Sequence, residues 1–351
     1  MKTALIYGVT GQDGSYLSEY LLKNDYRVIG VKRRSSSINT QRVDHLVKNY
    51  NQDQFNLMHG DITDTSSVYN IMSNVRPDEV YNLAAQSHVG VSFNEPEYTS
   101  QVDAVGTLRL IEAVKSIVPS SKYYQASTSE LFGGLSGHLL NEGSNLNPRS
   151  PYAAAKLYAY YIVRQYREAY NINAYNGILF NHESPRRGEN FVSRKITLSL
   201  KQIVNQEIEC IELGNLDAVR DWGHAKDYVE GMHLMLKKAP PDDYVLATGN
   251  CYSVRDFCIK AFDLIGCKID FSGTGIDETA TVIEHKESKI KCNRPKIGQV
   301  VVKVDKKFFR PLEVPHLQGD PSKFMNLTGW KPKTDFDGLV FDMVESDLKN
   351  L

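Results

Sequence analysis

The chain has 351 residues, of which 41% are hydrophobic and 24% are charged. This composition is typical of a folded globular protein and argues against intrinsic disorder, and the length suits one large domain or two closely packed ones. The formal net charge of −1 gives no general attraction for nucleic acid or for a membrane surface. An anionic ligand must therefore be held by local arginines and lysines.

The start of the chain and its cysteines indicate a cellular compartment. An apolar, strand-like run begins at once and no long apolar segment follows, so we expect neither a signal peptide nor a membrane-spanning helix. The five cysteines are Cys210, Cys251, Cys258, Cys267 and Cys292. They are scattered and odd in number, which favours reduced thiols over disulfides or a metal site. We therefore expect a cytoplasmic protein without a metal centre.

The first half of the chain alternates short apolar runs with helical stretches. Strands are predicted at residues 2–7, 26–32, 55–59, 79–83, 122–126 and 174–180, and helices at 14–23, 41–48, 66–73, 97–116 and 152–169. The strands read as continuous apolar runs, as expected when helices cover both faces of a parallel sheet. The alternation predicts an α/β fold with a doubly wound parallel Rossmann sheet, whose ligands bind at the carboxyl ends of the strands.

The alternation is lost in the second half. We expect a polar loop at 181–190, helices at 191–206 and 226–238, a strand at 244–247, a helix from an N-cap at Ser253 to residue 265, loops over 273–303, and an amphipathic helix from 336. The helix at 226–238 and the strand at 244–247 read as one further unit of the sheet. The rest indicates a smaller, mixed C-terminal domain.

A glycine-rich turn follows the first predicted strand. Gly8, Gly11 and Gly14 are spaced by threes and lead into a helix. Glycines allow a tight turn and let backbone N–H groups approach a pyrophosphate at the positive end of a helix. The spacing differs from the G-x-G-x-x-G fingerprint, so an ordinary turn is the alternative. The flanking strand and helix favour a dinucleotide site, with candidate contacts Gly8, Thr10, Gly11, Gln12, Asp13 and Gly14.

The end of the second predicted strand indicates which dinucleotide is bound. NAD sites usually carry an acidic residue there to hold the ribose 2′-hydroxyl. This chain has no carboxylate at that point and instead has Arg33, Arg34, Ser35 and Ser36. Paired guanidinium groups suit a 2′-phosphate, although a solvated basic turn is the alternative. We therefore predict NADP as the cofactor.

Two further strand ends supply weaker candidates. Asp61 and Ile62 follow the third strand and could lie along the adenine. Small residues follow the fourth strand and leave space beneath a cofactor; this segment is Leu83, Ala84, Ala85, Gln86 and Ser87. Neither segment is specific alone.

A tyrosine, a lysine and a glutamate are the candidate catalytic residues. Tyr152 is the only tyrosine followed by a lysine, Lys156, one helical turn later. A phenol has a pKa near ~10, so service as a base needs roughly 4 kcal/mol of extra phenolate stabilisation, which a nearby ammonium and a cationic nicotinamide favour. Thr128 and Glu130 lie just beyond the fifth predicted strand. A surface Tyr–Lys pair and a turn-capping Glu130 are the alternatives.

Longer segments carry a resemblance to a known family. The segments are GVTGQDGSY (8–16), RRSS (33–36), STSEL (127–131), RSPYA (149–153), NHESPRRG (181–188) and RDWGHAKD (220–227). Over nearly its whole length the chain resembles the extended short-chain dehydrogenase/reductases, and among them the GDP-mannose 4,6-dehydratase family. The stretch 279–296 is less similar to the family, which leaves the details of nucleotide recognition open.

The resemblance implies roles for individual residues. It implies that Thr128, Glu130 and Tyr152 are catalytic and that Lys156 holds the nicotinamide ribose. It adds Tyr98, His182 and Arg187 to the cofactor contacts. The implied substrate contacts are Ser87, Asn181, Lys195, Arg220 and Arg310, of which the cations would hold a diphosphate, although each could also be a solvated surface charge. Residues 33–36 would lie at an interface of a homodimer or homotetramer.

The implied reaction converts GDP-mannose to its 4-keto-6-deoxy product and water. Oxidation at C4 makes the C5 proton acidic, and Glu130 removes it and assists loss of the C6 hydroxyl. The reduced cofactor then returns its hydride to C6, and C5 is reprotonated. Enzymes of this fold that only epimerise or reduce usually lack an acid at the position of Glu130.

Three other functions compete with this one. They are a dehydratase that also reduces its product to GDP-rhamnose, a related NADP-dependent epimerase or reductase, and a non-catalytic NADP-sensing protein. We expect a dinucleotide-binding domain of residues 1–180 and about 216–250, and a sugar-nucleotide-binding domain of about 181–215 and 251–351.

Overall fold

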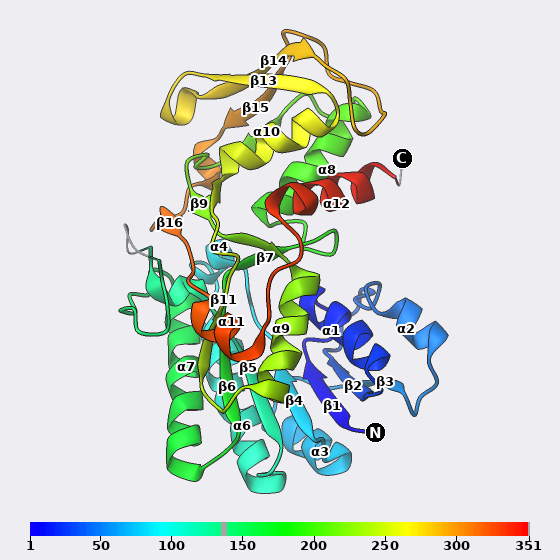
Figure 1. Ribbon diagram of the computed structural model, residues 1–351, viewed down its shortest axis with the longest axis vertical. Coiled ribbons are helices and arrows are strands. Elements are labelled where there is room, and N and C mark those ends of the chain that lie inside the picture. Colours follow the sequence, from blue (N-terminus) through cyan, green and yellow to red (C-terminus); the bar gives the residue numbers. More distant parts are fainter. Residues whose placement is uncertain (135–138, 350–351) are drawn as a thin grey trace.

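The computed structural model describes residues 1–134 and 139–349, and a parallel sheet forms its larger part (Figure 1). The strands are β1 (Thr3–Tyr7), β2 (Arg27–Lys32), β3 (Phe55–His59), β4 (Glu79–Asn82), β5 (Lys122–Thr128), β6 (Ala174–Leu179) and β11 (Asp243–Leu246). Their order is β11-β6-β5-β4-β1-β2-β3 and every neighbouring pair is parallel. The predicted Rossmann sheet is confirmed, including the added strand β11, and the order reverses between β1 and β4.

Helices cover both faces of this sheet. On one face α1 (Gln12–Lys23) packs beside α9 (Ala225–Lys238), and Leu17 and Met232 belong to the same apolar core. The other face carries α3 (Thr65–Val75), α6 (Gly106–Ile117) and α7 (Pro151–Tyr170), whose Ile71, Leu110 and Val163 share a second core. The short α2 (Asp44–Asn49) precedes β3. The sequence located these helices to within a few residues because their apolar faces repeat every turn.

The predicted helix at 97–116 is divided. It consists of α5 (Pro96–Ser100), one π-helical turn at Gln101–Val105, and α6. A π-turn accommodates an extra residue and often marks a functional site. The buried Asp103 lies in this turn. A short helix, α4 (Val89–Ser92), precedes α5.

The smaller part packs three helices against a four-stranded mixed sheet. The strands are β8 (Ile211–Leu213), β13 (Cys267–Ser272), β14 (Thr279–His285) and β15 (Val300–Val304), in the order β13-β14-β15-β8. The helices are α8 (Val192–Val204), α10 (Val254–Leu264) and α12 (Phe336–Leu348), and together they enclose a separate apolar core. Ser253 caps α10 as predicted, within a reciprocal capping box with Asp256.

Two loop predictions were wrong in part. The segment 273–303 contains β14 and all but the last residue of β15, and Ala280, Val282 and Val301 are buried. The alternation was hidden because register irregularities interrupt both strand pairings. The expected loop at 181–190 begins instead with β7 (Asn181–Glu183), a strand too short to show a period.

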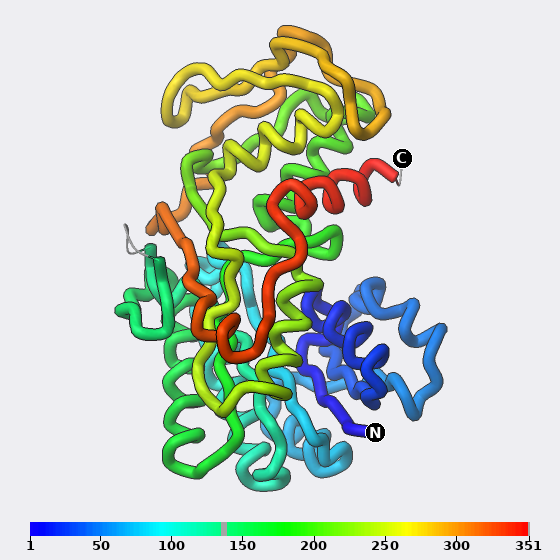
Figure 2. The backbone as a smooth tube through the Cα atoms, viewed as in Figure 1, coloured from blue at the N-terminus to red at the C-terminus, as the bar shows by residue number. Residues whose placement is uncertain are grey.

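Small sheets and a returning chain connect the two parts. β7 pairs with β10 (Trp222–His224), while β9 (Val219–Arg220) lies between β12 (Tyr252–Ser253) and β16 (His316–Leu317). Figure 2 shows the orange and red chain descending from β15 to α11 (Ser322–Thr328) and rising again to α12. Phe324 and Trp330 pack in the core beneath the large sheet. None of the helices in residues 1–134 and 139–349 has the length and apolar character needed to cross a membrane.

Candidate active site

A cavity of about 890 Å³ runs along the carboxyl edge of the large sheet and continues against the smaller part. This volume lies near the upper end of the usual range for ligand sites. The predicted residues that line it are Gly8, Thr10, Gly11, Gln12, Asp13, Gly14, Arg33, Asp61, Ile62, Leu83, Ala84, Ala85, Ser87, Tyr98, Thr128, Glu130, Tyr152, Lys156, Asn181, His182, Arg187, Lys195, Arg220 and Arg310. Arg34, Ser35, Ser36 and Gln86 are not among the lining residues.

The glycine turn leaves room for a ligand at the start of α1. Gly8 has a positive φ of 83°, and a β-carbon there would lie 2.7 Å from the backbone of Leu83. A β-carbon on Gly14 would lie 2.4 Å from the carbonyl oxygen of Gly8. Gly11 precedes the helix and provides no side-chain cap, so the first N–H groups of α1 are available to an anion. The turn therefore fits the predicted pyrophosphate site.

Two buried side chains fasten this turn to β7. The Nε2 of His182 lies 2.8 Å from Oδ2 of Asp13, and Ser184 donates to Oε1 of Gln12 at 2.7 Å. Burial alone would raise the pKa of Asp13, but the neighbouring His182 charge lowers it below its usual value. The pKa of His182 is raised because the attraction of Asp13 outweighs its burial. The two groups form a charged pair.

The remaining cofactor candidates divide into two kinds. Arg33 and Tyr98 both line the cavity and hydrogen bond to each other through the guanidinium and the phenol. Asp61 accepts from the backbone and hydroxyl of Thr63, which fixes its carboxylate beside the cavity. Gln86 differs, because its side-chain amide bonds the backbone of His88 and the hydroxyl of Thr99. It shapes the loop after β4 and is not among the residues that line the cavity.

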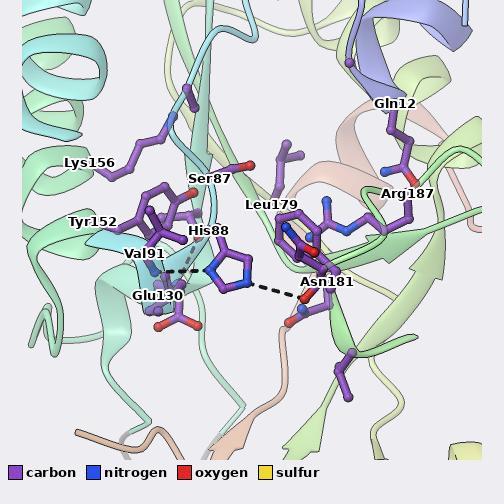
Figure 3. A pocket seen from close by; sticks show the side chains of 18 of the residues that line it. Gln12, Ser87, His88, Val91, Glu130, Tyr152, Lys156, Leu179, Asn181 and Arg187 are labelled. Carbon is purple, nitrogen blue, oxygen red and sulfur yellow. Dashed lines mark hydrogen bonds between the residues drawn. The ribbon is translucent and has the colours of Figure 1, made fainter. Parts of the chain in front are cut away.

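Tyr152 and Lys156 project from the first turns of α7 (Figure 3). Ser150 caps the helix by accepting from the N–H of Ala153 at 3.0 Å, and Pro151 occupies the first helical position. The ammonium of Lys156 donates to the carbonyl of Ala126 at 3.1 Å and lies 5.9 Å from the centroid of the Tyr152 ring. Both side chains are buried, which excludes a surface pair.

The protein alone does not favour the ionised form of Tyr152. Burial and the Asp103 carboxylate raise the pKa of the phenol, and a hydrogen bond with Thr128 only partly offsets them. Burial also lowers the pKa of Lys156, against the attraction of Asp103. The expected lowering of the tyrosine pKa therefore requires positive charge from outside the chain.

Thr128 and Glu130 lie at the end of β5, where the strand passes into a 3₁₀ helix (Ser129–Phe132). The strand is two residues longer than predicted, so Thr128 is its last residue. Its hydroxyl accepts from the N–H of Glu130 at 3.2 Å. Thr128, rather than Glu130, therefore caps this turn within the described residues. Glu130 is 9% exposed and lines the cavity together with Tyr152.

Two arginines from the smaller part, Arg220 and Arg310, lie near Glu130, and Lys195 lines the same cavity. Nη1 of Arg310 lies 3.6 Å from Oε1 of Glu130. Arg220 is buried, and burial lowers its pKa to about 10 despite the attraction of Glu130. The Lys195 ammonium lies 3.1 Å from the centroid of the Phe308 ring, and burial lowers its pKa to about 8. The cavity therefore has an anionic catalytic corner and a cationic wall.

Comparisons with known proteins agree with this arrangement. A family model described as GDP-mannose 4,6 dehydratase matches residues 5–343. The chain belongs to this family. The GDP-mannose 4,6-dehydratase of Vibrio cholerae is 52% identical over 354 residues, covering 99% of this chain and 94% of that protein. The human GDP-mannose 4,6 dehydratase is 52% identical over 353 residues, with 99% and 92% covered.

Solved structures support the fold of this dehydratase family member. UDP-glucuronic acid 4-epimerase from Bacillus cereus, in complex with UDP-glucuronic acid and NAD, has a TM-score of 0.80 at 20% identity and covers 99% of this chain and 100% of that one. RMD from Pseudomonas aeruginosa, complexed with NADPH, has a TM-score of 0.76 at 18% identity with the same coverage. Both structures contain a nicotinamide cofactor, but the identities are too low to carry more than the fold.

Sequence reasoning missed two polar residues in this family member. Asp103 is 1% exposed, and its Oδ2 is buried without a hydrogen-bond partner in the described structure. Burial raises its pKa to about 6, and the neighbouring Lys156 opposes that rise. His88 lines the cavity, where its Nδ1 accepts from the N–H of Val91 and its Nε2 lies 3.3 Å from the carbonyl of Asn190 (Figure 3).

These two residues could have been noticed in the sequence. Asp103 is an acid between Val102, Ala104 and Val105 in a predicted helix, which is unusual for a position facing a core. His88 directly follows the segment 83–87 that was expected beneath the cofactor. The signal for Asp103 was thus a charged residue among apolar neighbours, and the signal for His88 was its position next to a candidate cofactor segment.

Proposed function

We propose that this protein is a hydro-lyase that converts GDP-mannose to GDP-4-keto-6-deoxy-mannose and water, with NADP as its retained cofactor. Relatives that share about half of its residues over nearly its full length carry the dehydratase name. The observation that carries the mechanism is the placement of Tyr152 and Glu130 along one cavity, beyond the glycine turn. The relatives do not favour the alternatives that reduce or epimerise.

The residues present fit a dinucleotide with a 2′-phosphate. Gly8 and Gly14 leave a cradle that any β-carbon would fill, and the uncapped N–H groups of α1 can receive a pyrophosphate. Arg33 at the end of β2 lines the cavity and supplies the charge for a 2′-phosphate. No carboxylate follows β2 in the sequence to hold a free 2′-hydroxyl. NADP is therefore the cofactor that we propose.

Tyr152 is proposed to accept the proton of the C4 hydroxyl. Bound NADP supplies the hydride acceptor, the later hydride donor, and the positive charge that the phenol lacks in the protein alone. Thr128 hydrogen bonds the phenol and can orient the substrate hydroxyl. Lys156 is held by the carbonyl of Ala126 at a depth where it can reach a ribose.

Glu130 is proposed to act after C4 has become a ketone. The C5 proton then lies next to a carbonyl, and the C6 hydroxyl becomes a leaving group. Glu130 takes the C5 proton and can donate it to the departing oxygen, which leaves as water. Its carboxylate suits this role because Oε2 is buried, without a hydrogen-bond partner in the described residues, in the wall of the cavity.

The substrate nucleotide is proposed to lie against the smaller part. Arg220, Arg310 and Lys195 line that side of the cavity and can neutralise a diphosphate. Ser87 and Asn181 lie on the sheet side, where they can hydrogen bond the hexose. This division supports the proposal of two domains, with the segment around Phe324 and Trp330 belonging to the sheet side by its packing.

Mass spectrometry of a reaction with GDP-mannose and NADP tests the proposal directly. We expect a product lighter by one water, with no net reduction of NADP. Unchanged substrate after long incubation would instead support the NADP-sensing alternative. Consumption of added NADPH by the isolated keto product would support the second reduction to GDP-rhamnose.

Two further proposals concern the setting of the enzyme. We propose a homodimer or homotetramer in which the exposed residues 33–36 approach a second subunit, and light scattering would measure this state.

We propose a cytoplasmic location, which the five free cysteine thiols support.

A further inference from the structure

His88 lies in the cavity, close to the residues proposed to act on the hexose. In Figure 3 its ring lies between Tyr152 and Glu130 on one side and Asn181 on the other, and all four residues line the cavity. None of the proposed proton transfers uses this imidazole. Its contacts instead connect the large sheet to the smaller part.

The backbone of His88 is fixed to the sheet side. Its N–H donates to Oε1 of Gln86 at 2.8 Å, and Nε2 of Gln86 donates to its carbonyl at 3.2 Å. Gln86 is itself held, because its Nε2 also donates to the hydroxyl of Thr99 and its N–H donates to Oδ1 of Asp103. The imidazole therefore projects from a loop of fixed geometry.

Both ring nitrogens of His88 have a partner, and the partners define the tautomer. Nδ1 accepts from the N–H of Val91 at 3.1 Å and so caps α4, while Nε2 lies 3.3 Å from the carbonyl oxygen of Asn190. A carbonyl only accepts, so Nε2 carries the proton and Nδ1 carries none. Burial and the charges of Arg310 and Arg187 lower the pKa of His88, which favours the same neutral form.

The far end of the imidazole contacts the start of α8 in the smaller part. Asn190 directly precedes Phe191, the N-cap residue of α8, and the rings of His88 and Phe191 pack with centroids 5.4 Å apart. The carbonyl of Phe191 accepts from the N–H of Lys195 at 2.8 Å, within the first turns of α8. The contact with His88 therefore fixes the turn that carries Lys195.

We propose that His88 is a positioning residue, which spans the cavity and fixes the spacing between Lys195, which would hold the diphosphate, and Tyr152, which would act on the hexose. This inference rests on the proposed function and adds to it the residue that keeps the two ends of the substrate in register. A displacement of roughly 1 Å at the reacting atoms can slow a step by about 100-fold. A change of spacing would thus affect the hexose and leave the nucleotide contacts intact.

Two amide substitutions separate the span across the cavity from the cap of α4. In His88→Asn the side-chain oxygen takes the place of Nδ1 and can accept from Val91, as asparagine does at helix N-caps. This side chain is too short to reach the carbonyl of Asn190. In His88→Gln the side-chain nitrogen takes the place of the imidazole Nε2 and can donate to Asn190, while the cap is lost.

Steady-state kinetics with GDP-mannose should distinguish the two variants. We expect kcat to fall by about tenfold in His88→Asn, with KM within about twofold of the wild type, because the lost contact matters at the reacting centre. His88→Gln should keep the higher kcat of the two. Thermal unfolding should give the opposite order, because only His88→Gln loses the cap. A wild-type kcat in His88→Asn, or a lower kcat in His88→Gln, would overturn the proposal.

Binding of GDP gives a readout that needs no turnover. Calorimetric titration of the NADP-loaded protein should give affinities within about twofold of the wild type in both variants, because GDP does not extend to the hexose residues. A tenfold loss of GDP affinity in His88→Asn would place the effect at the nucleotide and overturn the proposal.

His285 provides a matched control variant. Its Nε2 also lies close to a backbone carbonyl, that of Pro295 at 2.9 Å, but it is not among the residues that line the cavity. His285→Asn should have wild-type kinetics, and an equal loss of kcat in it would overturn the assignment to the cavity. A wild-type protein that does not dehydrate GDP-mannose would overturn the proposed function together with this inference, whereas an active wild type with an equally active His88→Asn would overturn this inference alone.

Discussion

His182 and Asp13 lie 2.8 Å apart and join β7 to the first turn of α1. The imidazole also stacks on the ring of Tyr228, with centroids 4.6 Å apart. The glycine turn, which would receive the pyrophosphate, is therefore fixed by an ion pair between Asp13 and His182. His182 belongs to β7, which lies outside the large sheet. This arrangement makes the cofactor site depend on the protonation of a histidine.

Replacing His182 with phenylalanine should destabilise the fold in a pH-dependent way. The variant keeps the ring on Tyr228 but leaves the Asp13 carboxylate without its partner, at a cost of roughly 3 kcal/mol in unfolding free energy. Because the pKa of His182 is raised, its contribution is complete below 6.5 and is lost as the pH rises through its folded value. Urea unfolding on either side of 6.5 should therefore show the larger wild-type advantage at the lower pH.

His45 provides a matched control for this experiment. It also pairs with a carboxylate, Glu19, at 2.7 Å, but the histidine side chain is 42% exposed. His45→Phe should change the unfolding free energy by less than about 1 kcal/mol. An equal loss of unfolding free energy in the two variants would show that the buried His182–Asp13 pair stabilises the fold no more than the exposed His45–Glu19 pair.

Asp103→Asn should remove a pH-dependent penalty from the folded state. The pKa of Asp103 rises from 3.8 to about 6, so the folded protein holds this proton more tightly than the unfolded chain does. Stability from this group is complete below 3.8 and is lost as the pH rises through about 6. The stability difference between variant and wild type should therefore grow by about 3 kcal/mol across that interval. If the unfolding free energies of Asp103→Asn and wild type changed with pH in parallel, the raised pKa of Asp103 in the folded protein would be wrong.

The sheet was predictable because its physical signals are local. Continuous apolar runs marked all six expected strands, and the strand between residues 243 and 246 was recognised beside its helix. The π-turn around Asp103 packs against α7. It was not predictable, because nothing in the spacing of its own residues marks it. The strand β14 was missed because only two of its residues, Ala280 and Val282, are buried, and its last three residues are exposed.

Site residues were easier to predict than their partners. The glycine turn, Tyr152 and Glu130 follow from strand ends and helix spacing, and the structure places all of them along one cavity. The contact of Glu130 with Arg310 joins the 3₁₀ helix after β5 to a distant segment of the smaller part, and no local pattern encodes it. Gln86 was expected at the cofactor, and the structure shows its side chain hydrogen bonded to the backbone of His88 in its own loop. A polar side chain after a strand can serve either purpose, so the sequence alone does not distinguish them.

Arg33→Asp should weaken NADP far more than NAD. The loss of a charge-assisted contact with the 2′-phosphate is worth about 2 kcal/mol, or more than tenfold in affinity, and the new carboxylate can accept from a free 2′-hydroxyl. Fluorescence titration with both cofactors measures the ratio. Arg34→Asp is the control, because Arg34 is not among the cavity-lining residues and should leave the ratio nearly unchanged. Equal wild-type affinities for NADP and NAD would refute the choice of cofactor.

Glu130→Gln and Tyr152→Phe should stop the reaction at different points. Glutamine cannot accept the C5 proton, so oxidation at C4 should proceed while water loss falls by at least about 100-fold. Reduced cofactor should then accumulate on the enzyme as an absorbance at the NADPH band. Phenylalanine cannot accept the C4 hydroxyl proton, so this variant should give neither reduced cofactor nor product.

The contrast between these two variants distinguishes the loss of a specific proton acceptor from a general loss of substrate binding in the cavity. Both residues are buried along the same cavity, so a general loss of substrate binding would silence both in the same way. Stopped-flow absorbance with GDP-mannose distinguishes the cases, since only a competent Tyr152 can produce the early NADPH signal in Glu130→Gln. Full turnover by Glu130→Gln would remove that residue from the mechanism, and an early signal in Tyr152→Phe would require a different base at C4. The order of the two steps is thus fixed by which proton each side chain can hold.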